Sequence, residues 1–326
     1  MADSLSGSLI DWSGWLQALL QTLLFVGGAP LLAGWIRRCK CRLQNRRAPA
    51  LLQPYRDLAK LFRKQVVLAE NASPLFRVAP YIVFAAIVLA AATVPLLSTQ
   101  LPTAAIADMI VLVGFLAIGR FFLALAAMDI GTAFGGMGAS REVSLASLAE
   151  PAMLMVIFTL AMSAQSTNLS SVVQYLHDAG LVLRPSLLFA LLGLLLVAVA
   201  ETGRIPVDNP DTHLELTMVH EAMILEYSGR HLALLEWAAQ LKLMLYGVLI
   251  ANIFFPWGIA LDTDATALLT GVLAVTLKLL LIGVALAFAE TALAKMRLFL
   301  VPQFLNLAFL MALLGALSHI ILETGV

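Results

Sequence analysis

Residues 187–227 read LLFALLGLLLVAVAETGRIPVDNPDTHLELTMVHEAMILEY, and the boundary inside this stretch decides the fold. Leu187 to Ala200 is an apolar run without a break. The carboxylates that follow it are Glu201, Asp208, Asp211, Glu215, Glu221, Glu226 and, just beyond, Glu236. Carboxylates at a membrane edge are costly to bury unless they are neutralised, paired or hydrated. This density therefore indicates one of two roles, the movement of protons or the docking of a partner.

The composition places the apolar run in a membrane. Of the 326 residues, 61% are hydrophobic and 12% are charged, whereas about a quarter are charged in soluble domains. Several runs approach or exceed the length of a transmembrane helix, and the alternation of a membrane β-barrel is absent. We predict an all-α, polytopic membrane protein with a single membrane domain over residues 1–326. The eight predicted spans, of which the fifth is short, run near Leu16–Ile36, Val78–Leu97, Ala105–Ala127, Val143–Ala164, Ser186–Ala200, Trp237–Trp257, Ala265–Ala289 and Gln303–Ile321.

Basic residues are distributed unevenly between the loops, although the formal net charge is zero. The loop after the first span holds eleven of the twenty Lys and Arg residues. The even-numbered loops hold only Arg184, whereas the later odd-numbered loops hold Arg141, Arg204, Arg230, Lys295 and Arg297. By the positive-inside rule, the odd-numbered loops are cytoplasmic. Both termini are then predicted to be extracytoplasmic, and the long acidic loop is predicted to be cytoplasmic.

A short amphipathic helix is predicted in the first cytoplasmic loop. Leu51, Tyr55, Leu58 and Leu61 recur at helical spacing, while basic residues fill the other face. Such a helix either lies in the lipid interface or docks a partner, and the sequence leaves both interpretations open. The candidate docking residues of this loop and the next cytoplasmic loop are Arg46, Arg47, Arg56, Asp57, Lys60 and Arg141.

Several ionisable residues fall inside the predicted spans. Arg120, Lys242 and Lys278 lie within the third, sixth and seventh spans. Glu150 lies about 10 Å into the fourth. Intramembrane charges usually face the interior of a helix bundle or a hydrated path, and a buried structural ion pair is the alternative. For Glu150 and Glu201 we predict proton exchange rather than a structural role, because a carboxylate in a low-dielectric site holds its proton more readily.

Signatures of a catalytic site are missing from the sequence. It has no glycine-rich nucleotide motif, no P-loop, no HExxH motif and no Ser-His-Asp candidate. The five histidines include no pair at the i, i+4 spacing of a metal site, and Cys39 and Cys41 are interpreted as reduced cytoplasmic thiols. A stand-alone ion transporter is the alternative from another class, but the chain shows no internal repeat and no pair of broken helices in matching halves.

Three motifs carry a resemblance to a known family. They are NRRAPALLQPYRDLAK at 45–60, GASR at 138–141 with Glu150 nine residues after its arginine, and ETGRIPVD at 201–208, followed by the acidic loop and EYSG at 226–229. The chain resembles, over essentially its whole length, the subunit 1 family of respiratory complex I and its relatives in membrane-bound group 4 nickel–iron hydrogenases. Ala48 stands where that family usually has Gly.

Several details favour the hydrogenase branch of this family. The linker after the NRRAP element is shorter than in quinone-reducing members, and Ser144-Leu145 stand where those members usually carry Ala-Gln. Glu150-Pro151 is similar to the membrane subunits of formate hydrogenlyase and hydrogenase-4. The ETGR segment departs from the formate hydrogenlyase form, which reads EMGK, so the resemblance leaves the electron donor and acceptor open.

The resemblance implies a non-catalytic membrane subunit of an oxidoreductase complex, with no cofactor of its own. It would seat a hydrogenase-like large subunit and an iron–sulfur small subunit, which would hold the nickel–iron site and the iron–sulfur clusters. It would contact antiporter-like membrane subunits within the lipid bilayer of the cell inner (plasma) membrane, and no nucleic acid partner is expected. The alternative within the family is the corresponding membrane subunit of an NADH-quinone oxidoreductase, which contributes to a quinone chamber. The residues that match the family's proton path are Glu150, Glu201, Asp208, Asp211, Glu215 and Glu226.

Overall fold

The computed structural model describes residues 12–99, 102–180, 184–208, 218–260 and 265–323. Within these ranges the chain is helical apart from its loops and two isolated bridges, Ser98 with Ala260 and Asp108 with Asn168. The prediction of an all-α protein is therefore confirmed. Two predicted proton-path residues, Asp211 and Glu215, lie outside the described residues.

Eight helices account for the predicted spans. Seven in the described part of the chain are long and apolar enough to cross a membrane: α1 (Trp12–Leu43), α3 (Pro74–Thr93), α4 (Met109–Asp129), α5 (Ala133–Ala164), α9 (Gly229–Phe254), α10 (Ala265–Ala292) and α11 (Val301–Ser318), the last extended by η2 (Leu298–Leu300) and η3 (His319–Glu323). The eighth is α7 (Pro185–Glu201), whose 17 residues measure about 25 Å. The chain is a multi-pass membrane protein. Its shorter helices are α2 (Gln53–Arg63), η1 (Pro102–Ile106), α6 (Leu169–Asp178) and α8 (His220–Ile224).

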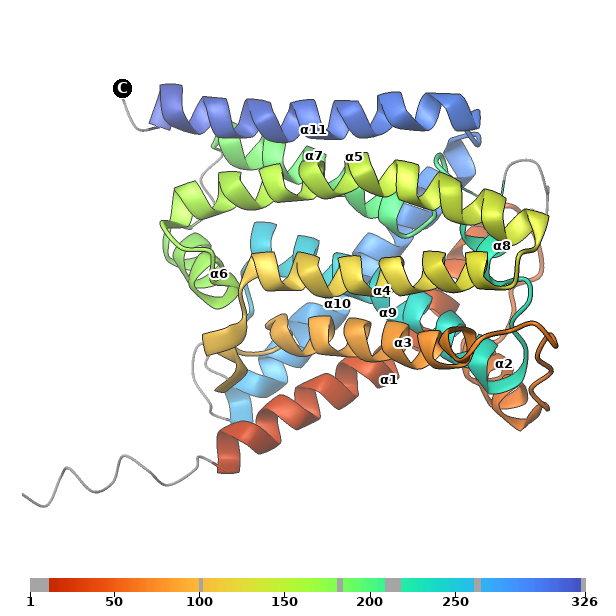
Figure 1. Cartoon of the computed structure of the whole chain (residues 1–326). Helices are drawn as coiled ribbons and strands as arrows, with labels where there is room; N and C mark the ends of the chain where they lie inside the picture. The colour runs from red at the N-terminus through yellow and green to blue at the C-terminus, as the bar shows by residue number, and fades with distance from the viewer. Residues whose placement is uncertain (1–11, 100–101, 181–183, 209–217, 261–264, 324–326) are drawn as a thin grey trace, which may run out of the picture.

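The long helices lie side by side in a bundle (Figure 1). Helix α11 lies along one edge, against α5 and α7, and α1 lies along the opposite edge, against α10. Helices α4, α3 and α9 fill the middle. Helix α9 contacts α1, α3, α7 and α10, and most of it is buried, which is why polar residues on it are held inside the protein.

The short helices mark the two ends of the bundle. Helices α2 and α8 lie at one end, and α6 lies at the other (Figure 1). Helix α1 begins at the α6 end and α11 finishes there, because eight crossings return the chain to the end where it started. The basic first loop and the acidic third loop therefore share the α2 end.

Several helix boundaries differ from the prediction, among them three helix starts. Helix α5 begins at Ala133 rather than near Val143, because the Thr132 hydroxyl accepts the Gly135 N–H (3.3 Å) and caps the helix. Helix α4 begins at Met109 rather than near Ala105, because Asp108 caps it by accepting the Ile110 N–H (2.7 Å). Helix α9 begins at Gly229 rather than Trp237. Arg141 consequently lies within a helix rather than in a loop, and Glu150 lies about 25 Å from the start of α5 rather than 10 Å.

The predicted amphipathic helix is α2. Its Pro54 and Leu58 are buried, and Phe62 meets the ring of Trp237 edge-on with centroids 6.3 Å apart. The Tyr55 hydroxyl donates to the carbonyl of Gly27 in α1. Helix α2 therefore packs on the bundle with its apolar face, which leaves its basic face exposed at the end of the protein.

Candidate functional site

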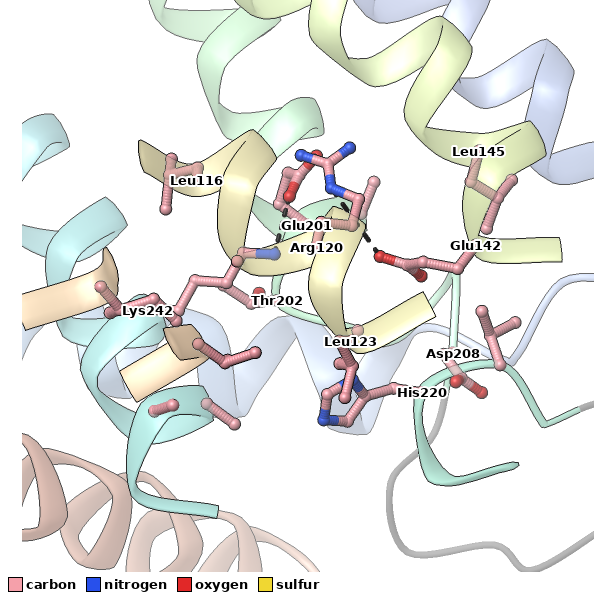
Figure 2. A pocket seen from close by; sticks show the side chains of 18 of the residues that line it. Leu116, Arg120, Leu123, Glu142, Leu145, Glu201, Thr202, Asp208, His220 and Lys242 are labelled. Carbon is pink, nitrogen blue, oxygen red and sulfur yellow. Dashed lines mark ion pairs between the residues drawn. The ribbon is translucent and has the colours of Figure 1, made fainter. Parts of the chain in front are cut away.

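Five ionisable side chains from four helices meet inside the bundle. Arg120 of α4 is central, and its guanidinium lies 2.9 Å from Glu201 of α7 (Figure 2). It also lies 3.4 Å from Glu150 and 4.0 Å from Glu142, both on α5. The ammonium of Lys242 on α9 lies 2.7 Å from the other oxygen of Glu201. These five residues are the inner cluster.

The inner cluster is enclosed and has one carboxylate in excess. The side chains of Glu201 and Arg120 are 5% and 8% exposed, and that of Glu150 is 37% exposed. Two cations face three carboxylates, so the fully ionised cluster carries one net negative charge. Both cations hold Glu201, whereas the ion pairs of Glu142 and Glu150 with Arg120 are longer. Glu142 and Glu150 are therefore the less tightly held carboxylates of the inner cluster.

The ETGR motif ends α7 and turns the chain sharply. The Gly203 N–H donates to the Ala200 carbonyl (3.2 Å) and the Arg204 N–H donates to the Val199 carbonyl (3.0 Å), which is a Schellman arrangement. Gly203 has φ +59°, a left-handed conformation that favours glycine. The turn leaves Glu201 at the last helical position, within the bundle, and sends Arg204 toward α10.

A second group of charges lies at the α2 end. Glu290 of α10 has a side chain only 1% exposed, between the ammonium of Lys40 and the guanidinium of Arg204, each at 3.1 Å. Asp208 pairs with Lys295 at 2.8 Å. We call Lys40, Arg204, Asp208, Glu290 and Lys295 the edge cluster. It joins α1, the segment after α7 and the end of α10, and its three cations outnumber its two carboxylates.

Two adjoining cavities connect the clusters. The first has a volume of about 80 Å³ and is lined by Arg120, Glu142, Glu201 and Lys242, which leaves room for several water molecules. The second has a volume of about 400 Å³, lies against α2 and includes the charged side chains of Lys40, Arg204 and Glu290 in its wall. Both are lined by Thr202, Gly203, Asp208, His220 and Ala239. Polar space therefore leads from the end of the bundle toward the inner cluster, with Asp208 and His220 at the junction (Figure 2).

Burial and charge act together on His220 at this junction. Desolvation lowers its pKa from the ordinary value, and the nearby positive charge of Lys242 lowers it further. Glu236 and Asp208 oppose these two effects, but the net direction is downward. His220 is therefore held in its neutral form near pH 7, in which one ring nitrogen accepts and the other donates a hydrogen bond.

The GASR motif explains how α5 meets the acidic loop. A Cβ added at Gly138 would lie 2.9 Å from both the Ala222 side chain and the Val219 carbonyl oxygen, so only glycine permits this approach of α5 to α8. Arg141, one turn later, donates from Nη1 to the Met218 carbonyl (2.8 Å). The structure places Arg141 against the end of the protein's own acidic loop, and its predicted docking of a partner stays a prediction.

The EYSG motif fixes the start of α9 to the segment after α2. The Ser228 hydroxyl accepts the Val67 N–H (2.8 Å) and donates to the Val67 carbonyl (2.9 Å). Tyr227 stacks on Phe76 with centroids 3.9 Å apart. Gly229 has φ +56°, and an added Cβ would lie 2.8 Å from the Gln65 carbonyl oxygen. This motif therefore has a clear structural role, and its Glu226 is exposed, away from the inner cluster.

The other predicted residues are spread over the molecule. Arg46, Arg47, Arg56 and Lys60 are exposed at the α2 end, and Asp57 accepts a hydrogen bond from Gln53 (2.9 Å). Lys278 is buried in α10, apart from both clusters, with its ammonium 5.7 Å from the centre of the Trp257 ring. Four predicted residues meet in the inner cluster: Arg120, Glu150, Glu201 and Lys242. The predicted Asp208 belongs to the edge cluster.

Two carboxylates of the clusters are not among the predicted site residues. Glu142 follows Arg141 directly and falls in a predicted loop, because the predicted span begins ten residues later than α5 does. Extending the helix back to Thr132 places Glu142 about two turns before Glu150. Glu290 sits at the cytoplasmic end of a predicted span, but no local signal links it to Lys40 or Arg204, which are distant in sequence.

The fold and the site define a class of protein: a polytopic membrane subunit whose ionisable groups are gathered inside the helix bundle and open toward one end. A profile of the family described as NADH dehydrogenase matches residues 16–322. The chain belongs to this family, that of complex I subunit 1, and the resemblance found in the sequence is confirmed.

Individual relatives cover almost the whole chain. Hydrogenase-4 component C of Escherichia coli (strain K12) is 35% identical over 91% of this chain and 93% of its own length. Formate hydrogenlyase subunit 4 of the same organism is 32% identical over 93% of this chain and 98% of its own length. A chain in the structure of the membrane-bound sulfane sulfur reductase, an archaeal respiratory membrane complex, has a TM-score of 0.76 over 94% of this chain and 99% of that chain. At 20% identity, this last match shows a shared fold.

Proposed function

We propose that this chain is the membrane anchor and energy-coupling subunit of a group 4 nickel–iron hydrogenase-type redox complex related to complex I. It would seat a hydrogenase-like large subunit and an iron–sulfur small subunit, which carry the nickel–iron site and the clusters. It would pass the energy of their reaction to antiporter-like membrane subunits. The relatives at 35% and 32% identity, matched over nearly their full lengths, support the hydrogenase branch.

The excess carboxylate of the inner cluster is the observation that carries the coupling role. A proton reaches the cluster through water in the two cavities and binds to Glu142 or Glu150. Its binding weakens the pull of that carboxylate on Arg120, whose guanidinium remains charged because its own proton is never released. Arg120 then pairs more closely with Glu201, and loss of the proton reverses the change. Each transfer moves one proton and breaks no other covalent bond.

The exposed basic face of α2 supports the docking role. Arg46, Arg47 and Arg56 surround a helix that is already held on the bundle through Leu58 and Tyr55. Because the apolar face is occupied by the protein itself, the basic face is free to attract an acidic surface of the soluble module. We also propose that the α2 end lies on the cytoplasmic side of the plasma membrane, with both termini outside, as the distribution of basic residues predicts.

Docking is tested by reversing three charges at once, because an exposed ion pair contributes only about 0–1 kcal/mol. A variant with Arg46, Arg47 and Arg56 changed to Glu should release the soluble module from membranes while the subunit stays inserted. The matched control changes three other exposed arginines of the same end, Arg77, Arg230 and Arg297. Retention of the module by the α2 variant at high salt would show that α2 only anchors to lipid.

The coupling role is tested with carboxamide variants, which keep shape but cannot ionise. Glu142→Gln and Glu150→Gln should reduce proton movement by membrane vesicles, while dye-linked hydrogenase activity of the soluble module is retained. Glu70→Gln, at an exposed carboxylate of the same end, is the control and should behave as wild type. Unchanged proton movement in the double variant Glu142→Gln/Glu150→Gln, with normal assembly, would rule out the inner cluster as a proton-exchanging site.

One observation favours a second candidate, a quinone-reductase subunit. An apolar cavity of about 290 Å³ lies between α1, α9 and α10, lined by residues that include Trp35, Met244 and Leu279. A cavity of this kind is suited to the apolar tail of a quinone. Quinone-dependent turnover of the purified complex would support this alternative, whereas hydrogen-dependent turnover without quinone supports the hydrogenase assignment.

A further inference from the structure

A groove of about 340 Å³ lies at the α6 end of the bundle, opposite the cavities described above. It runs between α6, the first half of α7 and the end of α9. Its wall is apolar and aromatic, and the residues that matter most are Leu187, Leu188, Leu191, Ile253, Phe254 and Trp257. His177 and Arg184 stand at its polar side. The groove therefore combines a long apolar wall with a cationic group at one end.

Arg184 is the cationic group, and its position is unusual for this chain. The sequence places no other Lys or Arg in the segments that connect helices at this end. The guanidinium is oriented by the Tyr175 hydroxyl, which accepts a hydrogen bond from Nη1 (2.8 Å). Among the described residues no carboxylate forms an ion pair with Arg184, whereas His177 is paired with Asp178 (3.3 Å). Arg184 thus offers oriented N–H donors to an anion.

Arg184 also stands at the start of a helix. It is the N-cap residue of α7, and its side chain makes no capping hydrogen bond. The first turn of a helix favours negative charge because its N–H groups lack partners within the helix. The positive end of α7 and the guanidinium therefore act in the same direction, at the same edge of the membrane.

Exposed leucines continue from the groove along α7 for about the length of one membrane leaflet. Leu188, Leu192 and Leu195 recur at i, i+4 and i+7 on α7 and are 50%, 40% and 38% exposed. From Arg184 to Leu195 the helix rises about 16 Å, and one leaflet of the hydrocarbon core is about 15 Å thick. Trp257 and Phe255 are also exposed beside the groove, as aromatic side chains are at the membrane interface.

We propose that this groove binds one anionic phospholipid, with its phosphate on Arg184 and one acyl chain along the leucines of α7. A transmembrane helix of a neighbouring subunit could pack on the apolar wall but would leave the guanidinium of Arg184 without an anion. A lipid phosphate at the membrane interface would pair with this guanidinium. Bidentate pairing of guanidinium with phosphate fits the fork of Arg better than the single ammonium of Lys. Under the topology proposed above, the lipid belongs to the extracytoplasmic leaflet.

The test measures lipid retained by the intact complex. The complex is placed in nanodiscs that contain phosphatidylglycerol and phosphatidylcholine, and bound lipid is counted by native mass spectrometry after release. Wild type should retain phosphatidylglycerol in preference to phosphatidylcholine. Arg184→Gln should lower that retention about tenfold, because a charge-assisted hydrogen bond is lost. Arg230→Gln, at an exposed arginine of the opposite end, should leave it unchanged.

Two further variants separate binding from folding. Leu188→Trp fills the groove and should expel the lipid although Arg184 is kept. Tyr175→Phe removes the hydrogen bond to Arg184 but not its charge, and it should keep most of the lipid. Equal retention of both lipids, no loss in Arg184→Gln, or an equal loss in Tyr175→Phe would overturn the proposal. So would a cross-link from Leu188→Cys to another subunit of the complex, because the groove would then be occupied by protein.

Discussion

The inner cluster has three carboxylates for two cations, whereas the edge cluster has three cations for two carboxylates. In the edge cluster both carboxylates are held by cations at 3.1 Å or less. In the inner cluster only Glu201 is held this closely, and Glu142 lies 4.0 Å from Arg120. The two clusters lie on adjoining cavities and use the same residue types.

The difference separates ion pairs that hold the helices together from ion pairs that are suited to exchanging a proton. A buried carboxylate between two cations cannot lose its charge without losing an ion pair with each of them, so Glu290 is suited to holding helices together. A carboxylate at the margin of a cluster with excess negative charge can take up a proton at small cost. The edge cluster is therefore interpreted as a structural clamp, and the inner cluster as the site of proton exchange. Four variants test this division, in order of expected effect.

The largest effect is expected for Glu290→Gln. Removing this charge leaves Lys40 and Arg204 facing each other in a buried site, and breaking a buried pair costs about 3–5 kcal/mol. The amount of subunit in membranes and the melting temperature of the purified complex should both fall. Glu226→Gln is the matched control, because that carboxylate is exposed. A Glu290→Gln complex that melts like wild type would contradict the clamp.

A smaller loss of stability is expected for Arg120→Met, about 2 kcal/mol, because Lys242 still compensates Glu201. Its effect on proton movement should be larger than its effect on stability. Adding Glu150→Gln in the same chain should restore part of the stability, because one of the stranded carboxylates is then neutral. If the double variant is less stable than Arg120→Met in thermal unfolding, Glu150 does not depend on Arg120.

Gly203→Ala tests the turn that separates the two clusters. An added Cβ would meet nothing within 4 Å, so the cost is confined to the left-handed backbone at φ +59°. That cost is about 1–2 kcal/mol. We expect the melting temperature of the complex to fall accordingly. Proton movement should fall as well if the altered turn displaces Arg204. An unchanged melting temperature would show that the turn tolerates Ala.

The smallest effect is expected for His220→Gln and depends on pH. The pKa of His220 is lowered, chiefly by burial, so below about pH 6.5 the unfolded chain binds a proton that the folded chain resists. Wild-type stability should therefore fall as pH falls below this value, and the variant should lose less. Melting curves at about pH 7.5 and about pH 5.5 measure the difference, and parallel losses in both proteins would place the acid sensitivity elsewhere.

The sequence predicts the fold well because its largest signals are local. Apolar runs identify the spans, and the alternation of leucines and basic residues identifies α2. The start of α5 is not predicted because residues 132–142 contain three glycines and two charged residues, which is typical of a loop. These residues are helical because Thr132 caps them and Gly138 packs against α8, and α8 lies about 80 residues away. Helix α6 has no counterpart in the prediction, being short and outside the apolar runs.

The sequence predicts every member of the inner cluster except Glu142, but not how the members pair. Arg120, Glu150, Glu201 and Lys242 stand out because charge is rare within apolar spans. Arg120 and Lys242 share Glu201 only because tertiary packing brings α9 against α7 and lets the long Arg120 side chain of α4 reach Glu201, which the sequence does not encode locally. The proton-exchange role of Glu150 and Glu201 stays a prediction. Both residues contact Arg120, but Glu201 is held by two cations, so the coupling proposed above uses Glu150 and Glu142 rather than Glu201.

The shortness of α7 bears on how the protein senses its surroundings. Helix α7 ends at Glu201 after about 25 Å, whereas the hydrocarbon core of a bilayer is about 30 Å thick. A bilayer adapts to a short helix by thinning, at a fraction of a kcal/mol for each Å of mismatch. Since Arg184 and Trp257 hold the other end at the interface, the mismatch falls at Glu201. In a bilayer with longer acyl chains Glu201 would lie deeper in the hydrocarbon core, and in one with shorter chains it would lie closer to water. Membrane thickness would therefore change how strongly this carboxylate is hydrated.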